Sequence, residues 1–201
     1  MLPSDLTCAL PDFKYDHDSL VQIADTYLTP EYQDLQICYT DDEAFPDNAY
    51  REYTHDSGYC RWCMLFFKDL PEDFSDLPLI QDIAELFSCC DSQSTTEKVY
   101  ENLFFFDIWG ELPFHKDNPY RSFGFNIPLV GCSEPTQWWS EESNTLLHEA
   151  DFSGPMMINT EVMLGCPANT GRRLFLSLDG FTESLSDVRH TLNAQGKIKQ
   201  D

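Results

Sequence analysis

Residues 114–131 read FHKDNPYRSFGFNIPLVG, and this stretch combines a strand signal with a candidate metal-binding pair. Its second half, residues 123–130, is a mostly apolar run that ends at a glycine, as is typical of a buried β-strand. Just before it, His115 and Asp117 stand one residue apart, so their side chains share a face if the chain is extended. An imidazole and a carboxylate are two corners of the facial triad that binds non-haem iron(II). The pair alone is a common pattern, and on this evidence alone a solvated turn ahead of a strand is the favoured interpretation.

The strand signal continues through the second half of the chain. From residue 97 onward, aromatic or β-branched runs alternate with clusters of Gly, Pro, Asn and Ser: EKVYENLFFFDIWGELPFH, RSFGFNIPLVG, TQWWSE, TLLHEAD, GPMMINTEVML and RRLFLSLDGF. Strands at such regular spacing, with no helix between them, predict a sandwich or a barrel. The expected fold class is therefore α+β and mainly β, with the β-core late in the chain.

The first half of the chain has a different character. Apolar residues recur at helical spacing after the capping candidates Asp16 and Asp18, which predicts a helix over residues 18–28. The same reasoning predicts a second helix over 77–89, a short strand over 34–40 and a polar, turn-rich loop over 41–58.

A chain of 201 residues is long enough for one domain with a real core and short for two. We expect a single domain, in which residues 1–95 supply helices and irregular segments that pack on a β-core at 96–188. Residues 189–201 are expected to form a frayed tail.

The charge of the chain is strongly negative, since 12 basic residues against 35 acidic ones give a net charge of −23. Such a field repels a phosphate backbone, so direct nucleic-acid binding is not expected. Solubility, a saline habitat or attraction of a basic protein partner explain the excess, and a DNA mimic ranks behind them because the acids are spread along the chain. No apolar run approaches the roughly 20 residues that span a bilayer, and the N-terminus lacks a secretory pattern, so a cytoplasmic location is expected.

Eight cysteines need an explanation. Cys60 and Cys63 in CRWC, with Cys89 and Cys90, form a candidate zinc set, although ligands adjacent in sequence strain tetrahedral geometry at one ion. CRWCMLFF reads as a strand, which disfavours a redox-active CxxC motif. Buried, reduced thiols explain the cysteines more simply in a cytoplasmic protein.

The segments FHKD, RSFGFNIPL, TQWW, GPMMINTEV and ANTGRRLFLSL follow one another between residues 105 and 180. In this order and near this spacing they resemble the iron(II)- and 2-oxoglutarate-dependent oxygenases, specifically the compact proteins common among phage and marine microbes. The resemblance implies a double-stranded β-helix of the jelly-roll or cupin-like kind, flanked by N-terminal helices. It also implies Fe(II) and 2-oxoglutarate as cofactors, and it leaves residues 1–95 without an assigned motif.

The resemblance also implies roles for single residues. His115 and Asp117 match the first two iron ligands, and Arg173 matches the arginine that pairs with the distal carboxylate of 2-oxoglutarate. A planar guanidinium suits that role because it meets a carboxylate with two hydrogen bonds. Ser177 matches the polar residue four positions later. The neighbouring Arg172 should point the other way and is interpreted as surface charge.

Asn126, and Asn159 with Thr160, fall at family positions that line or brace the pocket. The doublet Trp138 and Trp139 matches an aromatic strand of the family, for which we expect one ring in the core and one at the rim.

One position departs from the family pattern. The third iron ligand is a histidine usually followed by glycine, and here Leu164 precedes Gly165. Leucine offers no lone pair, so the triad is incomplete as the family builds it. Cys166 is the nearest substitute because it shares a face with Leu164 in an extended chain, whereas Glu161 or His148 would require a backbone rearrangement.

Three interpretations remain open. In the first, the protein binds iron through His115, Asp117 and a substitute, and uses O2 to hydroxylate an unknown substrate while converting 2-oxoglutarate to succinate and CO2. In the second, it retains 2-oxoglutarate or a similar acid through Arg173 without oxidation. In the third, the fold is a scaffold and the protein is a non-catalytic, acidic binding or interaction protein, of which a DNA mimic is one form.

Overall fold

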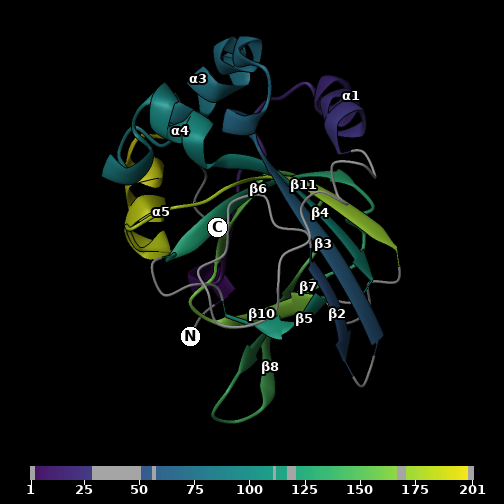
Figure 1. Ribbon diagram of the computed structural model, residues 1–201. Coiled ribbons are helices and arrows are strands. Elements are labelled where there is room, and N and C mark those ends of the chain that lie inside the picture. The colour runs from purple at the N-terminus through teal and green to yellow at the C-terminus, as the bar shows by residue number, and fades with distance from the viewer. Residues whose placement is uncertain are drawn as a thin grey trace.

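The computed structural model describes the chain over residues 3–28, 51–55, 58–110, 112–116, 121–166 and 171–198. Two antiparallel β-sheets face one another, and helices gather on the outer side of the larger sheet (Figure 1). The strand expected at 34–40 lies outside the described residues.

The larger sheet has seven strands, and every neighbouring pair is antiparallel. Their spatial order is β1 (Thr7–Ala9), β9 (Met156–Asn159), β6 (Phe123–Val130), β11 (Arg172–Leu178), β4 (Leu103–Gly110), β3 (Gly58–Phe66) and β2 (Arg51–His55). The smaller sheet has the order β5 (Leu112–His115), β10 (Met163–Cys166), β7 (Thr136–Ser140) and β8 (Thr145–Ala150).

The eight strands from β4 to β11 pass between the two sheets as a jelly roll does. β4, β6, β9 and β11 lie in the larger sheet, and β5, β7, β8 and β10 lie in the smaller one. This arrangement is a double-stranded β-helix, which confirms the expected fold class. The first half of the chain adds β1 at one edge of the larger sheet and β2 with β3 at the other.

The α-helices are α1 (His17–Tyr27), α3 (Pro78–Leu86), α4 (Thr96–Asn102) and α5 (Leu185–Ala194). Side chains cap the N-termini of α1, α4 and α5, whereas α3 begins at a proline without a side-chain cap. Side chains of Asp16, Thr95 and Ser184 accept hydrogen bonds from backbone amides of the first turns. Short 3-10 turns are η1 (Pro3–Asp5), η2 (Phe67–Asp69), η3 (Glu72–Asp76) and η4 (Asp91–Gln93). Within the described ranges, no helix is long and apolar enough to cross a membrane.

The larger sheet separates two apolar cores, because side chains of a strand alternate between its faces. The helix-side core contains Leu174, Leu176 and Leu178 of β11 together with buried residues of the four described α-helices. The intersheet core consists of Leu6, Ile108, Leu112, Trp138, Phe152, Met156, Ile158, Leu164, Cys166 and Phe175. It therefore joins side chains of both sheets inside the jelly roll.

Three local predictions were wrong. Residues 96–102 form α4 and not the start of a strand, because Thr95 caps a turn that buries Val99 before β4 begins. Residues 189–194 belong to α5 and not to a frayed tail, because Val188 and Leu192 anchor that helix in the core. Within the predicted loop over 41–58, residues 51–55 are strand β2, which pairs with β3.

The two predicted helices are confirmed with shorter or shifted ends, as α1 and α3. The reading of CRWCMLFF as a strand is also confirmed, since it lies within β3.

Candidate functional site

The side chain of Arg173 lies inside the jelly roll. Arg173 is on β11 opposite Ile108 of β4, and only 1% of its surface is exposed. Because Leu174 faces the helix-side core, the alternation of the strand turns Arg173 and Phe175 into the intersheet core. The guanidinium is 4.9 Å from the ring centroid of Phe175 and 5.9 Å from that of Phe152.

This guanidinium has few polar partners. Its Nη2 donates to Oγ1 of Thr136 at 3.3 Å, and its Nε is buried without a hydrogen-bond acceptor. None of the described carboxylates forms an ion pair with Arg173. Since an arginine stays protonated at any physiological pH, the structure encloses a positive charge and, within its described part, supplies no counter-ion.

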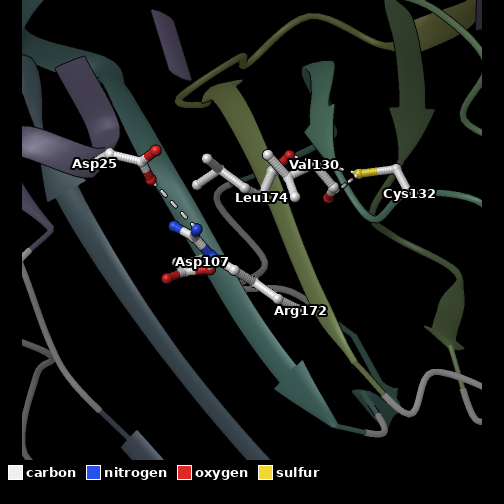
Figure 2. A network of polar contacts seen from close by, with 6 residues as sticks. All are labelled: Asp25, Asp107, Val130, Cys132, Arg172 and Leu174. Carbon is white, nitrogen blue, oxygen red and sulfur yellow. Dashed lines mark hydrogen bonds and ion pairs between the residues drawn. The ribbon is translucent and has the colours of Figure 1, made fainter. Parts of the chain in front are cut away.

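The nearest candidate for an internal counter-ion is the thiol of Cys132, and its protonation argues against it. Burial raises the pKa of Cys132, and the charge of Arg173 only partly opposes that rise. The thiol donates instead to the backbone carbonyls of Val130 at 3.2 Å and Leu174 at 3.5 Å (Figure 2). Cys132 is therefore a neutral neighbour of Arg173 at physiological pH.

Arg172 points away from this core, as expected, but it is not simple surface charge. Its Nε donates to Oδ1 of Asp107 at 2.8 Å, and Nη1 lies 3.4 Å from Oδ1 of Asp25 on α1 (Figure 2). Burial alone would lower the pKa of Arg172, and the hydrogen bonds and charges of the two carboxylates outweigh it and raise the pKa. Of the two adjacent arginines, Arg172 is thus paired with carboxylates, and Arg173 has no carboxylate partner among the described residues.

The side chains of Ser177 and Asn126 form a hydrogen bond with each other. They are partners across β11 and β6, and the Ser177 hydroxyl donates to Oδ1 of Asn126 at 2.5 Å. Both are buried and share the inward face with Arg173. Four residues of strand separate Ser177 from Arg173 by about 13 Å, so the two do not meet at one ligand atom. Their roles toward a cofactor stay predictions.

The side chain of Asn159 forms hydrogen bonds with backbone groups. Its Nδ2 donates to the Asp5 carbonyl at 3.0 Å, and its Oδ1 accepts from the Glu161 amide at 2.9 Å. Its own carbonyl accepts from Nε1 of Trp138 at 3.0 Å. Asn159 thus holds the end of β9 in place. Of the two predicted roles, lining a pocket and bracing it, this arrangement favours bracing. Trp138 is fully buried in the intersheet core, while Trp139 is half-buried against Phe114, as the doublet predicted.

The predicted iron ligands are only partly described. His115 ends β5 and lies directly opposite Leu164 of β10 in the antiparallel ladder. Residues paired in this way project to the same face, and Leu164 belongs to the intersheet core, so His115 is on the inward face. Asp117 lies outside the described residues.

Cys166 shares the inward face with Leu164, as expected, and is fully buried in the same core. Its ladder partner on β5 is Leu112, and the register shifts between the Leu164–His115 pair and the Cys166–Leu112 pair. Cys166 is therefore displaced along β5 from His115, towards the start of that strand. Its thiol lies 3.8 Å from the Glu134 carbonyl. Among the described residues, no group of three or more His, Cys, Asp or Glu is arranged to hold a metal ion.

The other histidines and cysteines have structural surroundings. His148 is a residue of strand β8, as predicted, and its Nε2 lies 3.2 Å from Oγ1 of Thr7. Cys63, Cys89 and Cys90 are buried or half-buried free thiols. Burial raises the pKa of Cys90 strongly, which keeps it protonated. The zinc hypothesis for Cys60, Cys63, Cys89 and Cys90 stays a prediction, since the side chain of Cys60 lies outside the described part.

The surroundings of Arg173 could not be found from the sequence. Thr136, Cys132 and Phe152 come from the start of β7, the turn before it and the segment that follows β8. Only the jelly-roll topology brings them to one guanidinium, and no local pattern in the chain marks them.

Comparisons with known proteins give only remote similarities. No protein-family model and no curated protein matches the sequence. Among solved structures, the chain is similar to a dioxygenase for auxin oxidation from Arabidopsis thaliana in complex with 2-oxoglutarate, at 10% identity and a TM-score of 0.46, over 83% of this chain and 79% of that one. A dioxygenase for auxin oxidation from rice matches at 9% identity and a TM-score of 0.48, over 98% and 88% of the two chains.

A C-terminally truncated Neurospora crassa T7H in apo form matches at 9% identity and a TM-score of 0.45, over 86% and 80%. Similarity at this level says nothing about chemistry. The fold assignment rests on the strand order, and the function has to be argued from the side chains of this chain.

Proposed function

We propose that this protein binds a small carboxylic acid inside its jelly roll through the guanidinium of Arg173, and that it does so without oxygenase chemistry. The observation behind the proposal is that Arg173 is 1% exposed, has an Nε without an acceptor and has no carboxylate partner among the described residues. The acid that the sequence resemblance implies is 2-oxoglutarate.

The energetics favour an anionic ligand over an arginine that serves packing alone. Removing a cation from water costs several kcal/mol even after the protein relaxes. Stacking on the rings of Phe152 and Phe175 returns about 0.5–2 kcal/mol, and one neutral hydrogen bond to Thr136 returns about 1 kcal/mol. A carboxylate would neutralise the charge and supply the missing acceptor at Nε, because it accepts two parallel hydrogen bonds from a guanidinium.

The same residues fit iron poorly. The facial triad needs three protein donors, and the residue opposite His115 is the hydrocarbon side chain of Leu164. Cys166 is offset along the strand, at the level of Leu112. The described residues therefore do not provide the three donors of the triad, and we assign no step of a reaction to iron.

Titration calorimetry with 2-oxoglutarate tests the proposal. The wild-type protein should bind the acid, and Arg173→Met should lose binding by at least about tenfold, the loss of one charge-assisted contact. Arg189→Met is the matched control, because Arg189 is a half-buried arginine on α5 that donates to the Ser4 carbonyl. Equal affinity in the wild type and Arg173→Met would contradict the proposal.

An assay for succinate separates binding from oxidation. The wild-type protein supplied with Fe(II), O2 and 2-oxoglutarate should release no succinate above the level of a heat-denatured sample. Sustained release that Arg173→Met abolishes would instead support the oxygenase interpretation.

A further inference from the structure

The intersheet core contains a single described charge that lacks a carboxylate partner. Among the buried residues that the structure describes, only Asp107 and Arg173 are charged, and Asp107 faces the helix side, where Arg172 pairs with it. Asn126 and Ser177, two other polar residues of the inward face, hydrogen-bond to each other. Among the buried residues that the structure describes, a bound anion therefore meets one permanent cation in this core, the guanidinium of Arg173.

The immediate neighbours of the guanidinium are aromatic. Phe152 and Phe175 form an edge-to-face pair with ring centroids 5.2 Å apart, and both rings are close to the guanidinium. Phe152 lies between β8 and β9, so its position depends on a connecting segment and not on a strand ladder. Arg173 donates a hydrogen bond to Thr136 at 3.3 Å, and the thiol of Cys132 is its second described polar neighbour.

The inward face farther from Arg173 is apolar as well. On β10 and β7 it contains Leu164, Cys166 and Trp138. Leu164 and Trp138 are ladder partners of one another, and Leu164 also faces His115. In a dicarboxylate or a 2-oxo acid, the second polar end would lie against such hydrocarbon groups. Burying a second charge without a partner is strongly unfavourable, whereas an apolar body gains from leaving water.

We infer that the acid bound at Arg173 is a monocarboxylate with an apolar, ring-bearing body, and that dicarboxylates such as 2-oxoglutarate bind less well. This inference rests on the proposed function, namely carboxylate binding at Arg173. It adds that Phe152 and Phe175 select the body of the ligand, and that the absence of a second cation selects against a second carboxylate.

A ranking of three acids on the wild-type protein tests the inference. Calorimetric affinities are measured for 3-phenylpropanoate, for glutarate and for 2-oxoglutarate, at one ionic strength. We expect 3-phenylpropanoate to bind at least about tenfold more tightly than either diacid, which corresponds to about 1.4 kcal/mol. The ranking uses the unmodified chain, so it does not depend on whether a variant folds.

Two variants identify the residues responsible. Arg173→Met should lose all three acids, and Phe152→Leu should weaken 3-phenylpropanoate by about three- to tenfold while leaving the weaker glutarate affinity unchanged. Circular dichroism and the midpoint of urea unfolding establish that both variants are folded.

The possible results separate the two proposals. If glutarate or 2-oxoglutarate binds as tightly as 3-phenylpropanoate or more tightly, the inference about the ligand class is overturned and carboxylate binding at Arg173 stands. If none of the acids binds, or if Arg173→Met leaves the affinities unchanged, both proposals are overturned.

Discussion

Leu164 lies directly opposite His115 in the antiparallel ladder between β10 and β5, and both side chains belong to the inward face of the smaller sheet. The sequence resemblance expects a metal-binding histidine at residue 164. A leucine at that place removes one donor and puts hydrocarbon against the imidazole. This pairing is the structural reason to separate the architecture of the protein from oxygenase chemistry.

Restoring the missing donor should restore metal affinity. In Leu164→His, two imidazoles would face each other across the ladder, and we expect the affinity for Co(II) or Fe(II) to rise at least about tenfold over the wild type. Metal titration followed by visible absorption or calorimetry measures this change.

Met163→His is the control for that experiment, because residue 163 is adjacent and lies on the opposite face of the strand. It should leave metal affinity unchanged. Tight metal binding by the wild-type protein, or equal gains in both variants, would show that Leu164 does not limit metal binding.

The ion pair on the other face of β11 should be important for stability. Asp107 is 3% exposed and accepts from Arg172 at 2.8 Å, so Asp107→Asn removes the charge of the buried partner. We expect the free energy of unfolding to fall by about 2 kcal/mol or more, less than for a fully buried pair because Arg172 reaches solvent. Urea unfolding at constant m-value measures the change.

Asp25→Asn is the matched comparison, since Asp25 is exposed and its oxygen is 3.4 Å from the same guanidinium. It should cost less than about 1 kcal/mol. If the two variants lose equal stability, burial of Asp107 is not what makes its contact strong.

His17 should make stability depend on pH in one direction. The pKa of His17 is raised, mainly by its hydrogen bond with Asp18 and then by the one with the Leu129 carbonyl at 2.8 Å. A raised folded-state pKa adds stability that is fully present below the unfolded value of 6.5 and is lost as pH rises through the folded value. Urea unfolding of the wild type and His17→Gln from pH 5.5 to 8 should show this difference shrinking with pH.

His148 should act in the opposite direction. Burial is the main cause that lowers its pKa, and the ring lies against Trp138 in a tilted arrangement with the ring centroids 5.5 Å apart. The folded protein therefore favours neutral His148, so its contribution is present above pH 6.5 and falls as pH drops below that value. Unfolding curves of His148→Gln should lose this acid-side decline, and a steeper decline would contradict the assignment.

The fold could be predicted because the strands of the β-core have clear local sequence patterns. The run Phe123–Val130 is buried on both faces, as a strand between two cores must be, and turn residues bound it. Helix α5 could also have been recognised, since Ser184 is a capping residue and Leu185, Val188 and Leu192 recur at helical spacing. Helix α4 is harder, because its seven residues run directly into β4 without a turn residue.

The site could be predicted only in part. The sequence resemblance singles out Arg173, and the alternation of a strand separates it from Arg172. That Arg173 lacks a counter-ion in the described part of the chain depends on where every charged residue of the core is placed, and on pairings such as that of Asp107 with Arg172, 65 positions apart. Such long-range pairings follow from the topology of the fold and cannot be recognised from any short segment of the sequence.

The most direct test of carboxylate binding at Arg173 is the NMR signal of its own Nε–H group, which has no acceptor among the residues that the structure describes. In 15N-labelled protein, with the resonance assigned by its loss in Arg173→Lys, titration with 3-phenylpropanoate or 2-oxoglutarate should move the Nε–H proton downfield and saturate. An equal concentration of sodium chloride should not reproduce the shift. A resonance that stays in place while either acid binds, or that responds to no acid, would contradict the account.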